Sequence, residues 1–72
     1  MDLVPVRCRV PELTRKIGKT QQWVANQIGM SKQQLSDYVN LRYIPNIVIL
    51  MKLAKLFGVH IEDLYVWDWR EE

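Results

Sequence analysis

The chain has 72 residues, of which 49% are hydrophobic and 25% are charged, as is typical of a soluble globular domain. A chain of this length can bury only about 60% of the surface that it exposes when unfolded, so we expect one small domain over residues 1–72. No apolar run approaches the roughly 20 residues of a membrane span, and the charged N-terminus does not resemble a signal peptide. The single cysteine, Cys8, excludes an internal disulfide and fits a reducing, cytoplasmic location.

The net charge of +2 conceals an uneven distribution along the chain. Residues 1–44 hold seven Lys/Arg against three Asp/Glu, whereas residues 45–72 hold three against five. A basic front and an acidic back are typical of a protein that turns one surface toward an anion. A solvated surface without a partner would account for the same distribution.

Helix-start and helix-stop residues divide the first half of the chain into short helices. Pro11 suits the first turn of a helix, and Gly18 would end it. Thr20 can cap a second helix, which Gly29 would stop. We therefore expect two helices before residue 30.

The second half of the chain carries the same signals. Ser31 with Gln34 has the pattern of a capping box that opens a third helix. Asn46 can cap a fourth helix, in which apolar residues recur at helical spacing as far as Gly58. His60 precedes a last turn or two of helix.

Strand-like alternation is confined to residues 3–10. We therefore predict an all-α domain of five short helices. Its core would lie within residues 9–65, followed by an aromatic C-terminal tail in residues 66–72.

The predicted third helix has two distinct faces, because successive residues are rotated by 100°. The buried face would hold Leu35, Tyr38 and Val39. The opposite face carries donors and acceptors of mixed type: Lys32, Gln33, Ser36, Asp37 and Asn40. A helix that is merely solvated is usually built from Glu and Lys, whereas amides and lysines can read base edges in the major groove. Solvation and DNA recognition would each explain this face.

The spacing around the third helix favours DNA. Two helices separated by IGMS, with Ala25 in the first and Gly29 at the corner, match the helix-turn-helix. With TQQWVANQIGMSKQQLSDYVN, IPN and LMKLAKLFGVHIEDLY in this order, the chain from about Arg9 to Tyr65 resembles the phage Cro/repressor (xenobiotic-response-element) family of DNA-binding domains. The resemblance implies a compact lambda-repressor-like fold, with the helix-turn-helix formed by helices 2 and 3. It also implies a sequence-specific, double-stranded DNA-binding transcriptional regulator, expected to be a repressor of a bacterium, prophage or mobile element.

The resemblance assigns roles to individual residues. It implies that base edges are contacted by Lys32, Gln33 and Asp37, with Ser36 between them. It implies that the DNA backbone is contacted by Gln21, Asn40, Arg42 and Tyr43, with Lys19 adding charge nearby. Leu41 departs from the family, which usually has glycine there, so we expect either an unfavourable backbone conformation or a differently shaped loop.

One recognition helix reads only a few base pairs, so we expect a homodimer on a near-palindromic operator in the nucleoid. The predicted dimer interface is Tyr65, Val66, Trp67 and Trp69. These aromatic residues could instead fold back on their own core.

A rival function is a protein-interaction module that binds another regulator through Trp23 or the C-terminal aromatics. The sequence has no nucleophile–base pair, phosphate loop or metal-ligand spacing, so we expect neither an enzyme nor a cofactor.

Overall fold

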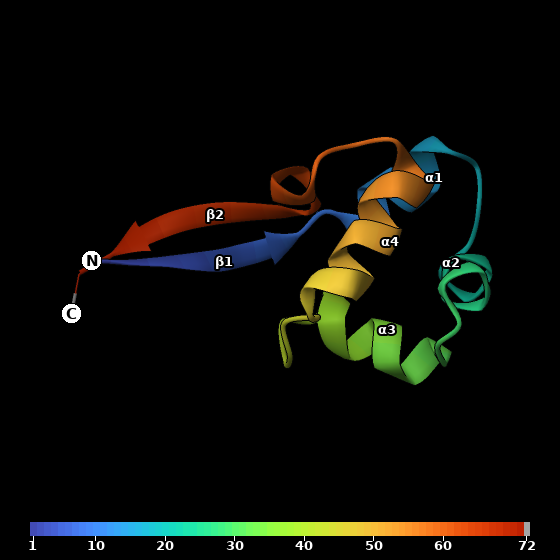
Figure 1. The fold of residues 1–72 in the computed structure, drawn as a ribbon, viewed down its shortest axis with the longest axis horizontal. Coiled ribbons are helices and arrows are strands. Elements are labelled where there is room, and N and C mark those ends of the chain that lie inside the picture. Colours follow the sequence, from blue (N-terminus) through green and yellow to red (C-terminus); the bar gives the residue numbers. More distant parts are fainter. Residues whose placement is uncertain (72) are drawn as a thin grey trace.

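The computed structural model describes residues 1–71. Helices form a globular body, and a two-stranded antiparallel sheet projects from it (Figure 1). The elements in chain order are β1 (Asp2–Cys8), α1 (Val10–Lys16), α2 (Gln21–Ile28), α3 (Lys32–Val39), α4 (Ile47–Phe57), the 3₁₀ helix η1 (Ile61–Leu64) and β2 (Tyr65–Arg70). Among these elements, no helix has the length and apolar character needed to cross a membrane.

The prediction of an all-α domain with five helices is wrong. The aromatic tail forms β2, which pairs with β1 in a register that runs from Asp2↔Arg70 to Cys8↔Tyr65. The expected fifth helix is one 3₁₀ helix of four residues. The tail alternates aromatic residues with others, a composition that favours strands, and β1 supplies a partner for its backbone hydrogen bonds.

The two-stranded sheet has an apolar face that is continuous with the core. Directly opposed residues share a face of a sheet, and the pairs in question are Leu3↔Trp69, Pro5↔Trp67 and Cys8↔Tyr65. At the base of the sheet Cys8 and Tyr65 are buried, whereas at its tip Leu3 is 48% and Trp69 is 62% exposed. The apolar face is therefore covered near the body and bare at the tip.

The predicted caps define the helices of the body. Each of three N-cap side chains accepts a hydrogen bond from a backbone N–H: Thr20 from Trp23 at 3.1 Å, Ser31 from Gln34 at 3.1 Å and Asn46 from Ile49 at 3.0 Å. The Gln34 side chain accepts in return from the Ser31 N–H, which confirms the capping box. These local interactions fix where the three helices begin.

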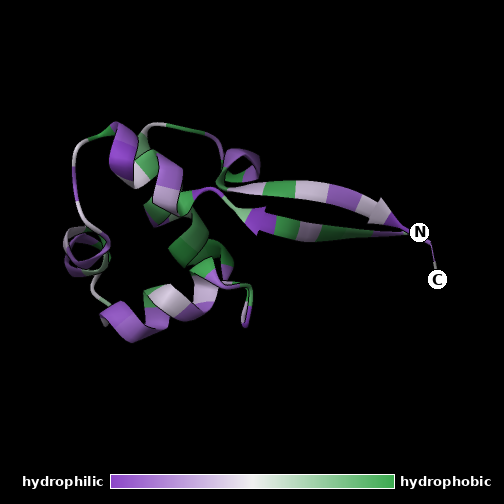
Figure 2. Ribbon diagram, turned by 180° about the vertical axis from the view of Figure 1, so that it is seen from behind, coloured by the Kyte–Doolittle hydropathy of each residue, from purple (hydrophilic) through white to green (hydrophobic). Residues whose placement is uncertain are grey.

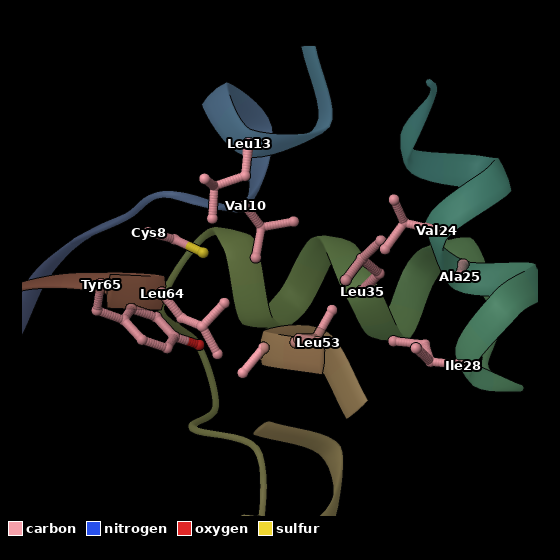
Figure 3. Packing of buried hydrophobic residues seen from close by; sticks show 11 residues of the cluster. Cys8, Val10, Leu13, Val24, Ala25, Ile28, Leu35, Leu53, Leu64 and Tyr65 are labelled. Atoms are coloured by element: carbon pink, nitrogen blue, oxygen red, sulfur yellow. The ribbon is translucent and has the colours of Figure 1, made fainter. Parts of the chain in front are cut away.

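The core lies between the helices and the base of the sheet. Its largest fully buried side chains are Val10, Val24, Leu35, Leu53 and Leu64. Val24 and Ile28 of α2 point toward Leu35 of α3 and Leu53 of α4 (Figure 3). The core therefore holds α3 to the body by its apolar face.

Candidate nucleic-acid interface

α2 and α3 form a helix-turn-helix in which α3 lies across the body from α1 and α2 lies at the end away from the sheet (Figure 1). Gly29 ends α2 with a positive φ of 75°, and Met30 N–H donates to the Ala25 carbonyl at 3.0 Å. Ala25 has no exposed surface, so no room is left for a larger side chain in α2 at this point. The predicted helix-turn-helix is thus present, with its corner at Gly29.

The outward face of α3 is polar (Figure 2). Lys32 and Gln33 are exposed, whereas Ser36 and Asp37 are half-buried. Leu35, on the opposite face, is fully buried. The four predicted base-reading residues therefore lie on one helix that its apolar side holds firmly in place.

A hydrogen-bond network connects several of these polar residues. Asp37 Oδ1 accepts from Gln33 Nε2 at 3.2 Å and from Arg42 Nη1 at 3.0 Å. Asn40 Nδ2 donates to the Ser36 carbonyl at 3.0 Å and to Ser36 Oγ at 3.2 Å. The negative charge of Asp37 is therefore paired with a cation before any DNA arrives.

Of the two alternatives expected at Leu41, the structure shows the unfavourable backbone conformation. Its φ is 62°, in the left-handed region that glycine prefers. Arg42 N–H donates to the Asp37 carbonyl at 2.9 Å and Leu41 N–H to the Tyr38 carbonyl at 3.2 Å, which is the Schellman pattern. The half-buried Leu41 side chain packs against the core. This turn brings Arg42 back beside α3.

The predicted DNA-backbone residues lie at the two ends of the helix-turn-helix. Lys19 is exposed just before α2, and its Nζ lies 5.1 Å from the centroid of the Trp23 ring. Gln21 is the half-buried first residue of α2. Arg42 and Tyr43 are exposed in the segment that follows α3. Trp23 is partly buried and packs against the core, so it offers less free surface than the sequence suggested.

The four residues predicted for a dimer interface differ strongly in exposure. Tyr65 is 3% exposed and belongs to the core, and Val66 and Trp67 are half-buried. Trp69 is exposed at the tip of the sheet, opposite Leu3. Sequence reasoning did not connect Leu3 with this surface, although the alternation in residues 3–10 was a signal that β1 exists.

Comparison with known proteins agrees with this geometry. A helix-turn-helix family model matches residues 12–64, which include α2, the turn and α3. The chain belongs to this helix-turn-helix family. The resemblance to Cro/repressor domains drawn from the sequence is thereby confirmed, and this helix-turn-helix protein is a DNA-binding transcriptional regulator.

Relatives of this helix-turn-helix protein occur in bacteria and archaea. It is 35% identical over 68 residues to an SPbeta prophage-derived HTH-type transcriptional regulator, YotL, of Bacillus subtilis, covering 93% of this chain and 85% of YotL. It is 30% identical over 63 residues to an HTH-type transcriptional regulator of Archaeoglobus fulgidus, covering 88% and 90%. A transcriptional regulator from Listeria innocua has the same fold, with a TM-score of 0.67 at 17% identity. That match covers 93% of this chain and 66% of the Listeria protein.

Proposed function

We propose that this protein recognises a specific sequence of duplex DNA with α3 in the major groove and represses transcription by occupying that site. The supporting observation is the division of α3 into two faces. Its apolar side is anchored through the fully buried Leu35, while Lys32 and Gln33 extend outward from the first turn. The first turn of a recognition helix is the part that reaches base edges, and lysine and glutamine have groups that pair with guanine and adenine. Ser36, one turn further, would complete the reading surface.

Contacts to the DNA backbone would flank this reading surface. Lys19 and Gln21 would approach phosphates at the start of α2, and Arg42 and Tyr43 would do so beyond the end of α3. Asn40 presents a further requirement. Its Nδ2 donates to Ser36 in the free protein, and a phosphate oxygen can only accept. A contact to the DNA backbone would therefore replace one of these two hydrogen bonds to Ser36 with one to a phosphate oxygen.

The operator would be near-palindromic and bound by a homodimer in the cytoplasm, on the DNA of the nucleoid. A single α3 offers too few base contacts to select one site in a genome. Of the residues predicted for the dimer interface, Trp69 has the free apolar surface that an interface anchor needs. Leu3 lies opposite it on β1 and would extend the interface.

Selection of bound sequences from random duplex DNA tests the proposal. Gln33→Ala should abolish base preference at one position and weaken binding to the best site by about 1–3 kcal/mol. The matched control is Gln27→Ala, which removes an exposed glutamine of α2. If Gln33→Ala selects the same sequence as the unaltered protein, α3 is not the reader.

The backbone contacts have a separate test in the salt dependence of binding. Lys19→Ala should weaken all sequences alike and reduce the slope of log K against log salt by about one unit. Lys19 suits this test because it makes no salt bridge with an acid among the described residues, whereas Arg42 is paired with Asp37. An unchanged salt slope would exclude Lys19 from the backbone contacts.

A protein-interaction module remains the second candidate function, and the bare tip of the sheet favours it. Leu3 and Trp69 form an exposed apolar pair, which a protein partner could cover as well as a second copy could. Failure of the unaltered protein to select any DNA sequence would favour this second function.

A further inference from the structure

The Asp37 carboxylate lies between the proposed base reader Gln33 and the loop residue Arg42. Both hydrogen bonds reach the same carboxylate oxygen, at 3.2 Å from Gln33 Nε2 and 3.0 Å from Arg42 Nη1. The Asp37 side chain is 21% exposed, compared with 62% for Arg42. Asp37 is thus the more enclosed member of the network, which suits a group that positions others.

The chemistry of the carboxylate fixes the orientation of the Gln33 amide. An ionised carboxylate only accepts hydrogen bonds, so the amide nitrogen of Gln33, and not its oxygen, must face Asp37. One of the two Gln33 N–H groups is then occupied. The other N–H and the amide oxygen remain free, and together they form an edge with one donor and one acceptor.

Such an edge distinguishes adenine from guanine. In the major groove adenine presents the N7 acceptor and the N6 donor, whereas guanine presents two acceptors, N7 and O6. A glutamine amide free to rotate can turn N–H groups toward either purine. We propose that Asp37 is a positioning residue that makes Gln33 select adenine over guanine, an inference that rests on the proposed role of Gln33 as reader. This role replaces direct base reading by Asp37.

Arg42 allows the Asp37 carboxylate to lie on a surface that faces DNA. An unpaired carboxylate on the reading face would repel phosphates and would be unfavourable in the last turns of α3, where the helix dipole is negative. The turn at Leu41 returns the Arg42 backbone to the Asp37 carbonyl at 2.9 Å, so the guanidinium is held close to the carboxylate. Arg42 therefore neutralises the charge that orients Gln33.

The experiment compares Asp37→Ala with Asp37→Asn in sequence selection from random duplex DNA. The relevant base pair is the one whose preference Gln33→Ala abolishes. There the unaltered protein should prefer adenine over guanine by about 5- to 150-fold, the range expected for a bidentate contact. Asp37→Ala should reduce this ratio to below about threefold. Asp37→Asn should retain the preference, because its amide oxygen can still accept from Gln33.

The orientation of Gln33 can also be measured without DNA. In the free protein, the ¹⁵N–¹H heteronuclear NOE of the Gln33 side-chain amide should show more restricted motion than that of Gln27. Gln27 is an exposed glutamine whose side chain makes no hydrogen bond within the described structure. In Asp37→Ala the Gln33 value should fall to the level of Gln27, and circular dichroism should show that α3 remains helical.

The outcomes distinguish a failure of the positioning role of Asp37 from a failure of the proposed DNA recognition. An adenine preference that survives Asp37→Ala, or a Gln33 amide as mobile as Gln27 in the unaltered protein, overturns the positioning role alone. An unaltered protein that selects no sequence overturns the proposed function and this inference with it.

Discussion

The indole N–H of Trp67 donates to the backbone carbonyl oxygen of Glu62 at 3.1 Å. The Trp67 ring also meets the ring of Tyr65 edge-on, with 5.6 Å between the centroids. Trp67 therefore fastens β2 to η1 and to the core. Trp69, two residues later on the same face, is 62% exposed. The two tryptophans of the tail thus have different roles, although the sequence alone presents them as a pair.

This difference predicts opposite effects on stability. Trp67→Ala should lower the free energy of unfolding by about 1–3 kcal/mol, because it removes a half-buried ring together with its hydrogen bond. Trp69→Ala should change it by no more than about 0.5 kcal/mol, as is usual for exposed positions. Urea denaturation of the two variants checks both values. Equal losses would mean that the tip of the sheet is packed as firmly as its base.

Trp69→Ala also tests the proposed dimer. If the tip of the sheet joins two copies, the unaltered protein should sediment as a dimer and Trp69→Ala as a folded monomer with weaker binding to a two-half-site operator. Truncation after Leu64 would be a poor test, because it removes Tyr65 from the core. An unaltered protein that is monomeric at high concentration, both free and on DNA, would rule out the dimer.

The left-handed backbone of Leu41 predicts an unusual ranking of substitutions. Leu41→Gly and Leu41→Ala both remove the side chain that packs on the core, but only alanine keeps the backbone strain at a φ of 62°. Leu41→Gly should therefore be more stable than Leu41→Ala by about 1 kcal/mol. Thermal unfolding of the two variants measures this difference. If alanine is as stable as glycine, the turn after α3 has a different conformation.

The corner of the helix-turn-helix should not tolerate added volume. Ala25→Leu introduces bulk at a fully buried position between α2 and α3, and should cost about 1–3 kcal/mol of stability. In a domain this small, such a loss is a large part of the total. Gln27→Leu makes the matched change at an exposed position of the same helix and should be nearly neutral. An unchanged melting temperature for Ala25→Leu would contradict the close packing of the two helices.

The Cys8–Tyr65 pair at the base of the sheet predicts a loss of stability at alkaline pH. Burial raises the pKa of the Tyr65 phenol, and the neighbouring Cys8 raises it further. Burial also raises the pKa of the Cys8 thiol above its ordinary value of 9.0. A hydrogen bond with the Val10 backbone lowers this pKa, but by less than burial raises it. The unfolded chain therefore loses these protons first. The stabilisation is complete below about pH 9 and is lost as the pH rises.

Melting curves between pH 8 and pH 11 test this dependence. For each of the two groups, the free energy of unfolding can fall by up to about 1.4 kcal/mol per pH unit in the range where the group is ionised only in the unfolded chain. Tyr65→Phe keeps the ring and removes the hydroxyl, so the melting temperature of this variant should fall less steeply with pH. A slope identical to that of the unaltered protein would show that Tyr65 does not titrate on unfolding.

The helix-turn-helix could be predicted from the sequence because its signals are local. Caps such as Thr20 and Ser31 act on backbone groups three residues away. Helical periodicity likewise identifies the buried face of α3 from residues within two turns of one another. The positions of the predicted reading residues on one helix followed from the same short-range rules.

The sheet and the role proposed for Asp37 depend on contacts that only the tertiary structure reveals. β2 forms because residues at opposite ends of the chain meet, with Asp2 opposite Arg70, and no window of neighbouring residues contains that pairing. The sequence resemblance assigned Asp37 to the reading of base edges, and only the left-handed turn at Leu41 shows that Arg42 lies against its carboxylate. Local periodicity determines which way a helical side chain points. The partner that it meets there is determined by how the chain folds back on itself, because burial and hydrogen bonding between distant segments can outweigh local preference.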